Sequence, residues 1–241
     1  MNINDLEEKI RQSESMSLSA AFPILMRKVY LWMAMALAIS GLTAYSVAAS
    51  PGLVQLIYSN SLVMWGCIIA ELVMVWKISN SVTKENRSLA TTTLMFIIFS
   101  ALNGLTLSSI FVVFAPAAIV KTFVITAGTF GVMAAYGYFT SRDLTKIGGL
   151  LFMALIGVII ASVVNMFLHS SGLDLVVSII GVLVFVGLTA WDSQQIKMSL
   201  AMAPDLGETS QKLAVTGALS LYLDFVNLFL YLLRFFGGSR D

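Results

Sequence analysis

Long apolar runs alternate with short polar segments along almost the whole chain. Each run is long enough to cross the hydrocarbon core of a bilayer as a helix, which takes about 20 residues. None shows the residue-by-residue alternation that marks a barrel strand. The pattern therefore predicts an all-α integral membrane protein with seven transmembrane helices. The runs lie at roughly 29–49, 60–78, 89–114, 117–139, 147–168, 173–194 and 213–236.

Composition points to the same class. Of the 241 residues, 58% are hydrophobic and 11% are charged, against about 25% charged in soluble domains. Seven spans of this length leave no room for a sizeable soluble domain. The formal net charge is +1, and no basic cluster stands apart from the loops, so nucleic acid is not expected as a partner. The single cysteine, Cys67, excludes an intrachain disulfide.

The first 28 residues are polar. Their opening, Asn4-Asp5-Leu6-Glu7-Glu8, is acidic where the start of a signal peptide is basic. We expect an uncleaved polar leader at 1–28, flexible and of mixed charge, then a seven-helix transmembrane domain at 29–236 and a short tail at 237–241.

Basic residues fall mainly on one side of the expected spans. Of the 14 Lys and Arg residues, all but Lys121, Arg234 and Arg240 lie in the leader or in the loops that share its side. Because cytoplasmic loops are enriched in Lys and Arg, we expect a cytoplasmic N-terminus. Seven spans then leave the tail outside with two basic residues, which mildly opposes the rule. A re-entrant last segment is the competing topology.

Small residues recur inside the fourth, fifth and sixth runs. Small side chains let helix backbones approach closely in lipid, where hydrophobic attraction between helices is weak. We expect six of them to pack helix against helix: Gly128, Gly131, Ala135, Gly157, Ala161 and Gly181.

Three acidic residues, Glu71, Asp192 and Asp224, stand inside runs that otherwise suit lipid. A carboxylate in hydrocarbon costs about 2.5–3.5 kcal/mol on insertion scales, so each is a candidate for function. Glu71 lies in the middle of its run and is expected either in an ion pathway or as a hydrogen-bonded packing group.

The last run carries a polar seam. Its members recur every three or four residues and so share one face of a helix. Lipid offers such a seam no hydrogen bonds, so we expect this helix to run through the centre of the bundle. Ser220 and Asn227 support the seam, in a pathway or as hydrogen bonds between helices. The seam consists of Gly217, Ser220, Asp224, Asn227 and Tyr231.

Asp192 and Asp224 are expected at different depths. Asp192 is about 7–8 Å from the basic loop, whereas Asp224 is about 18 Å beyond Lys212. They meet only if the sixth helix continues inward or the loop dips. Two carboxyls in contact share one proton, which would make a pH sensor. When both ionise, they offer hard oxygen ligands to a divalent cation such as calcium, completed by other oxygens.

The segments around these acids resemble the Bax inhibitor family, the transmembrane Bax-inhibitor-motif proteins. The resemblance implies a bacterial-type member in the inner (plasma) membrane, with six helices around a central seventh. It also implies a pH-sensitive calcium leak controlled by Asp192 and Asp224, with calcium as the permeant or weakly bound ion and no cofactor. Glu71 matches an acidic position of the family's second helix. The matching segments are Ile69-Ala70-Glu71, Asp192-Ser193-Gln194-Gln195-Ile196-Lys197, Leu219-Ser220-Leu221-Tyr222-Leu223-Asp224-Phe225-Val226-Asn227-Leu228-Phe229 and Leu232-Leu233-Arg234-Phe235-Phe236-Gly237.

One residue departs from the family pattern. In members with the clearest gate, an arginine late in the second helix pairs with the first aspartate and holds the pore shut. Val82 occupies the equivalent position here. We expect Lys77, Lys84 or Arg87 to take its place. A lysine would make a looser latch, because it lacks the bidentate fork of arginine.

Two other function classes remain open. The chain could be a regulatory protein that binds another membrane protein, such as a quality-control protease or a cell-death component, with structural aspartates. Intramembrane aspartyl proteases also place two aspartates in consecutive helices, but Leu221-Tyr222-Leu223 stands where they have Gly-x-Gly. No other hydrolase or nucleotide-binding motif is present, so we expect no enzyme. His169 lacks partners at ligand spacing and is expected to be solvated.

Overall fold

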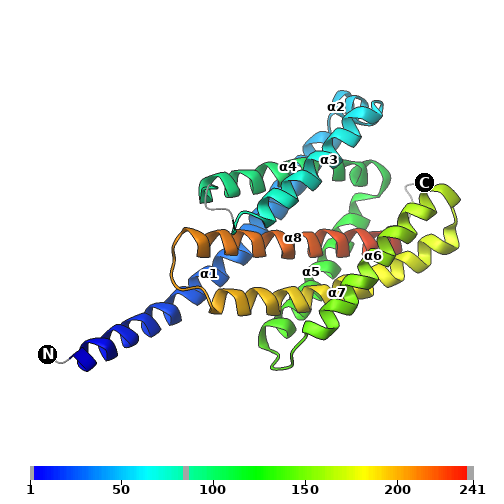
Figure 1. Cartoon of the computed structure of the whole chain (residues 1–241). Helices are drawn as coiled ribbons and strands as arrows, with labels where there is room; N and C mark the ends of the chain where they lie inside the picture. Colours follow the sequence, from blue (N-terminus) through cyan, green and yellow to red (C-terminus); the bar gives the residue numbers. More distant parts are fainter. Residues whose placement is uncertain (1–2, 84–86, 238–241) are drawn as a thin grey trace.

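The computed structural model describes residues 3–83 and 87–237, with the backbone alone for residues 3–20. Over these ranges the chain forms eight α-helices and no strand (Figure 1). The helices are α1 (Ile3–Ala48), α2 (Pro51–Tyr58), α3 (Ser61–Ser79), α4 (Leu89–Val113), α5 (Pro116–Phe139), α6 (Thr145–Leu168), α7 (Ser171–Ala201) and α8 (Glu208–Phe236).

Seven of these helices are long and apolar enough to cross a membrane, which confirms the predicted fold class. They follow the seven predicted runs in order. The first candidate span begins at Ala21, and α1 itself begins at Ile3. One helix thus covers part of the predicted leader and the first predicted run, and the boundary at 28 stays a prediction. Of the predicted tail, residues 238–241 lie outside the described residues.

Short local signals set several helix ends. Pro51 and Pro116 stand in the first turns of α2 and α5, where the missing N–H costs no hydrogen bond. The Ser88 hydroxyl accepts the Thr91 N–H at the start of α4. At the end of α6, His169 adopts a left-handed conformation with φ of 50°. Helix α2 was not predicted, since eight residues are too few for a span.

Helices α7 and α8 extend beyond their predicted runs. Helix α7 continues to Ala201 and α8 begins at Glu208. Neighbouring helices hold both polar ends. On α8, Glu208 Oε1 accepts the Leu89 N–H at 2.6 Å, and Gln211 Oε1 accepts from Lys28 Nζ at 2.8 Å. On α7, Lys197 Nζ donates to the Tyr138 carbonyl at 2.7 Å. The extra turns thus form a polar end of the bundle, where the basic loops gather.

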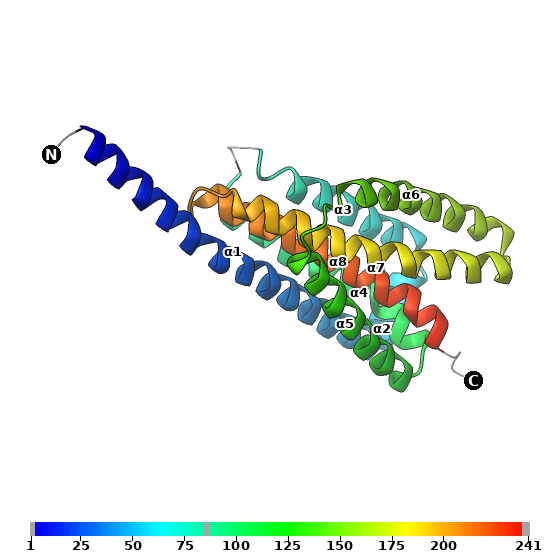
Figure 2. The ribbon, with the colours of Figure 1, turned by 90° about the horizontal axis from the view of Figure 1, so that it is seen from below.

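Helix α8 is the most buried span. Of its most apolar 18-residue stretch, 61% is buried, against 11% for α6 and 6% for α3. It packs against α1, α3, α4, α5 and α7, whereas α6 packs against α7. Figure 2 shows α3 and α6 on the edge of the bundle opposite α1 and α5. The expected ring of six helices around α8 is therefore not confirmed, because α6 lies in an outer position.

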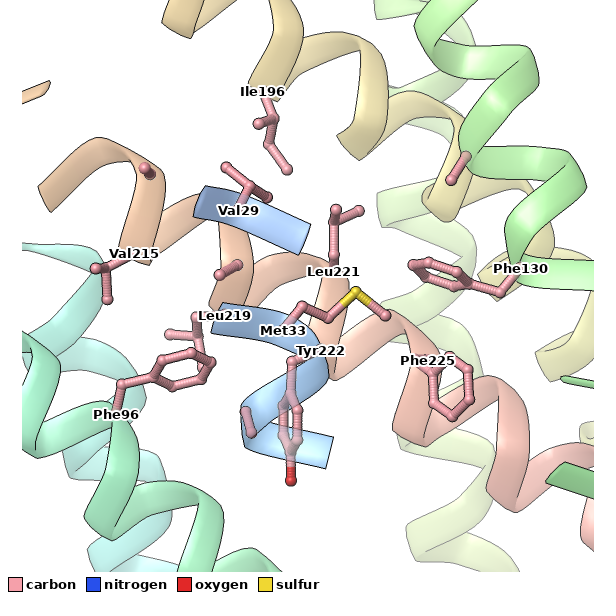
Figure 3. Packing of buried hydrophobic residues seen from close by; sticks show 14 of the residues in the cluster. Val29, Met33, Phe96, Phe130, Ile196, Val215, Leu219, Leu221, Tyr222 and Phe225 are labelled. Carbon is pink, nitrogen blue, oxygen red and sulfur yellow. The ribbon is translucent and has the colours of Figure 1, made fainter. Parts of the chain in front are cut away.

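The core is built around the side chains of α8. Tyr222 is fully buried, and its ring meets Phe96 and Phe99 of α4 edge to face, at centroid distances of 6.0 and 5.7 Å. One turn further along, Phe225 meets Phe130 of α5 at 5.4 Å. Figure 3 shows the rings of Phe96, Phe130, Tyr222 and Phe225 around the α8 backbone, together with Met33 of α1. Such edge-to-face pairs add about 0.5–1.5 kcal/mol each to the burial of their surface.

Glycines bring some helices very close together. A Cβ at Gly104 of α4 would clash with the backbone at Ser40 of α1, and one at Gly137 of α5 would clash with the Ala190 carbonyl of α7. Gly181 packs against the Tyr231 ring, as its predicted packing role requires. The packing role predicted for Gly128, Gly131 and Gly157 is wrong, because a Cβ at each of these positions would meet nothing within 4 Å. Ala135 is exposed and Ala161 is partly exposed.

The two classes of glycine predict different responses to the same substitution. Gly137→Ala should lower the free energy of unfolding by about 1–3 kcal/mol, because α5 must move away from α7. The matched change Gly157→Ala on α6 should leave the free energy of unfolding unchanged or raise it by up to about 1 kcal/mol, because alanine favours the helix. Unfolding of the purified variants in detergent measures both. Equal stability of the two variants would contradict the close approach of α5 and α7.

Candidate functional site

Asp192 of α7 and Asp224 of α8 meet between the two helices, where each carboxyl is the hydrogen-bonding neighbour of the other. Asp224 is buried, with 5% of its surface exposed, and its Oδ2 atom has no hydrogen-bond partner among the described residues. Neither carboxyl forms an ion pair with a described basic residue. Two adjacent carboxyls without a cation cannot both ionise cheaply, so the pair must hold a proton or a bound cation.

The two acids meet although they lie at different distances from the α7–α8 loop, because the ends of the two helices are offset. Asp192 is nine residues before the last residue of α7, and Asp224 is 16 residues beyond the first residue of α8. The two helices pack closely enough for a diagonal contact, because Gly217 lies against Ile196 and Gly181 against Tyr231.

A small cavity leads to the pair from the polar end of α7 and α8. Its volume is about 160 Å³. Asp192 and Ser220 lie at its deep end, and Ser199 and Thr216 line it nearer the α7–α8 loop, with Gln195 between them. Cavities with several polar groups hold water. The arrangement gives water and small ions a polar route toward Asp192.

Beyond the pair, the packing is apolar. Phe225 follows Asp224 directly and packs edge to face against Phe123 and Phe130 of α5, each at 5.4 Å between ring centroids. Leu228 and Leu232 continue this buried face of α8. On the side of α8 that carries Asp224, the polar residues between Asp224 and Leu232 are Asn227 and Tyr231. The neighbouring face, which carries Phe225, Leu228 and Leu232, is buried and apolar.

Glu71 lies in a separate polar cluster and does not contact the aspartate pair. Its carboxylate accepts a hydrogen bond from Thr106 Oγ1 at 2.9 Å and from Asn103 Nδ2 at 3.2 Å, both on α4. The Tyr222 hydroxyl donates to Asn103 Oδ1 at 2.8 Å and lies 2.7 Å from Ser40 Oγ of α1. A continuous chain of hydrogen bonds thus joins α3, α4, α8 and α1.

The polar seam of α8 divides between these two places. Ser220 and Gly217 line the cavity beside Asp192, whereas Asn227 lines a second cavity of about 200 Å³ beside Glu71. Tyr231 stacks on Phe185 of α7. The seam is therefore not one pathway. Sequence reasoning missed Asn103 and Thr106, although two polar residues spaced by three in an apolar run were an available signal.

The expected latch residues are not near Asp192. Lys77 is exposed at the end of α3, and Arg87 donates its hydrogen bond to the Lys77 carbonyl. Lys84 lies outside the described residues. The expectation that Lys77 or Arg87 pairs with Asp192 is therefore wrong for this conformation, because the α3–α4 loop holds Arg87 on its own side. The buried base at this end is Lys212, which sequence reasoning did not select and which pairs with Glu208 at 3.5 Å.

The described residues contain no group of three or more His, Cys, Asp or Glu side chains that could hold a metal ion. His169 is exposed, and its ring nitrogen Nδ1 lies 3.2 Å from the Phe167 carbonyl. Calcium prefers six to eight oxygen ligands. Asp192 and Asp224 alone would therefore bind calcium weakly, with water filling most of its coordination shell.

One known protein family and several bacterial proteins match this chain over most of its length. Residues 23–241 match the family described as "Inhibitor of apoptosis-promoting Bax1". The chain is 48% identical over 217 residues to the inner membrane protein YbhL of Escherichia coli K12, covering 89% of this chain and 92% of YbhL. It is 47% identical over 214 residues to an uncharacterized protein of Borreliella burgdorferi, covering 89% and 91%. A protein of Rickettsia prowazekii is 41% identical over 216 residues, covering 90% of each chain.

The contacts of Glu71 predict a coupled effect on stability. Thr106→Val removes a donor from the Glu71 carboxylate and should lower the free energy of unfolding by about 1–3 kcal/mol. In a Glu71→Leu background the same change should have little effect, because no carboxylate remains unsatisfied. Thr126→Val is the matched control, since the Thr126 hydroxyl bonds within α5 to the Thr122 carbonyl. A double-mutant cycle on denaturant unfolding measures the coupling, and its absence would refute the contact.

Proposed function

This chain belongs to the Bax inhibitor family of multi-pass membrane proteins, and we propose that it is a cation leak controlled by its carboxyl pair. One observation carries the proposal: Asp192 and Asp224 lie together without a basic partner at the end of a polar cavity. Because YbhL is an inner membrane protein, we place this chain in the inner membrane as well.

The pair favours small cations by its charge. A proton or a metal cation compensates the two carboxyls equally well, so the two compete for the same place. Calcium is the cation that suits hard oxygen ligands in an incomplete, water-filled shell. Gln195, Ser199, Thr216 and Ser220 supply neutral oxygens along the approach. Weak binding suits a permeant ion, which must leave the site as readily as it enters.

The polar end of the bundle faces the cytoplasm in this proposal. The basic side chains at this end, which include Lys28, Arg142, Lys197 and Lys212, follow the rule that cytoplasmic loops carry the positive charge. The cavity beside Asp192 then opens toward the cytoplasm. Protons and calcium on that side reach the pair through the cavity, which makes the cytoplasmic pH the controlling variable.

Closure rests on apolar packing in this proposal. The rings of Phe225, Phe123 and Phe130 fill the space beyond Asp224. Hydrated cations do not cross such a constriction, because it stays free of water. Opening then requires α8 to move relative to α5 or α7. Ionisation of both carboxyls supplies a force in that direction, since two negative charges in contact repel each other.

The pair predicts how flux depends on pH. Purified protein in liposomes should pass calcium slowly. The rate should rise between about pH 6 and pH 8, because loss of the shared proton leaves two negative charges that favour opening. Asp192→Asn and Asp224→Asn keep the shape of the side chain but remove a titrating group, so both variants should lose most of the pH dependence. Asp174→Asn is the matched control, because Asp174 pairs with Arg234 at the opposite end of α7. An unchanged pH profile in the double variant would exclude the pair as the sensor.

Closure by apolar packing and closure by an ionic latch predict opposite effects of substitutions on the calcium leak. If apolar packing closes it, Phe225→Ala should raise the resting calcium leak severalfold, whereas Lys77→Gln, Lys84→Gln and Arg87→Gln should leave the leak unchanged. Calcium flux at fixed pH, with thermal unfolding of each variant as a control, separates the cases. A higher leak in one of the basic variants alone would instead favour an ionic latch.

A further inference from the structure

Helices α1 and α5 both pack on α8 (Figure 2). A groove lined by residues of α1 and α5 lies between them. Its volume is about 640 Å³, within the roughly 300–1,000 Å³ of typical ligand sites. Met26 and Tyr30 line it from α1, and Phe130, Gly131 and Ala134 line it from α5. The walls are thus apolar along most of their length.

Small residues on α5 leave the groove open on that side. Gly131 lies on this wall, and a Cβ there would meet nothing within 4 Å. In membrane proteins a glycine face usually receives a neighbouring helix, but no described helix fills this one. A separate apolar cavity of about 110 Å³ lies among α1, α4, α5 and α8, beside Leu37, Phe123 and Phe229. The groove itself is open along Gly131 and apolar, so it has room for an acyl chain.

The polar end of the groove is positively charged. Arg27 lines it, is exposed, and forms no ion pair with a described carboxylate. Lys197 lies close by, donating to the Tyr138 carbonyl at 2.7 Å with its Nζ 5.3 Å from the centre of the Tyr138 ring. The acid of the adjacent loop, Asp143, accepts the Thr145 N–H, and hydrogen bonds from Thr145 lower the pKa of Asp143. Asp143 is thus engaged within its own loop.

We propose that the α1–α5 groove binds one anionic phospholipid, with its phosphate at Arg27 and an acyl chain along Gly131. Basic pockets between membrane helices on the positively charged side recognise anionic head groups. The apolar walls of the groove supply the remaining contact, since each buried methylene adds to binding. The proposal rests on the groove alone and does not depend on the cation leak.

Native mass spectrometry of the full chain in a neutral detergent tests this site. Phosphatidylglycerol and phosphatidylcholine with identical acyl chains are added separately. The parent should retain one phosphatidylglycerol with an affinity several times that for phosphatidylcholine. Arg27→Gln should weaken phosphatidylglycerol binding about fivefold and remove the preference. Gly131→Leu should reduce binding of both lipids, because the new side chain occupies the place of the acyl chain.

Matched variants separate the site from general effects. Arg142→Gln removes another exposed base from the same end, and Gly157→Leu enlarges another glycine that meets nothing within 4 Å. Both should bind lipid like the parent. Thermal unfolding checks folding, and Gly131→Ala serves as a milder change if Gly131→Leu is unstable. Equal affinity of the parent for the two lipids, or full lipid binding by a folded Gly131→Leu variant, would overturn the proposal.

Discussion

The contact between two carboxyls with no basic partner is the constraint on which the rest of this structure depends. Placing Asp192 and Asp224 together in a region of low dielectric is unfavourable unless a proton or a cation joins them. Helix α8 is surrounded by packed neighbours, and a polar cavity reaches Asp192 from the α7–α8 loop. Charge balance at one contact therefore links helix packing, solvent access and proton occupancy.

Glu71, the other acid inside a span with a candidate role, differs from the aspartate pair in its hydrogen bonding. Glu71 receives two hydrogen bonds from α4, and these continue through Asn103 and Tyr222 to Ser40. A carboxylate with donors on both oxygens is compensated by the protein itself. The aspartate pair lacks such donors, because Asp224 Oδ2 is buried without one among the described residues. The two acidic positions therefore differ in their compensation: Glu71 is hydrogen-bonded by another helix, whereas the aspartate pair needs a proton or a cation.

Much of this arrangement could be predicted from the sequence, and the exceptions have physical reasons. The seven spans follow from run length alone, and the acids from the cost of burying charge. The true ends of α7 and α8 could not be predicted, because their polar residues are held by side chains distant in sequence, such as Lys28. Glycine spacing identified Gly181 but not Gly104 or Gly137, since spacing does not show which face of a helix meets a neighbour. The position of Arg87 depends on a loop contact with no sequence signal.

Helix α3 is little buried by its neighbours, and its short length makes it sensitive to the thickness of the membrane. The helix has 19 residues, which at 1.5 Å per residue is about 29 Å, close to the roughly 30 Å of a typical hydrocarbon core. Such a helix has almost no length to spare for tilt, whereas α7 and α8, with 31 and 29 residues, tolerate thicker bilayers. In a thicker bilayer, the mismatch between α3 and the hydrocarbon core costs fractions of a kcal/mol per ångström, whereas the longer neighbouring helices are unaffected. Lipid composition thereby acts mechanically on the helix that carries Glu71.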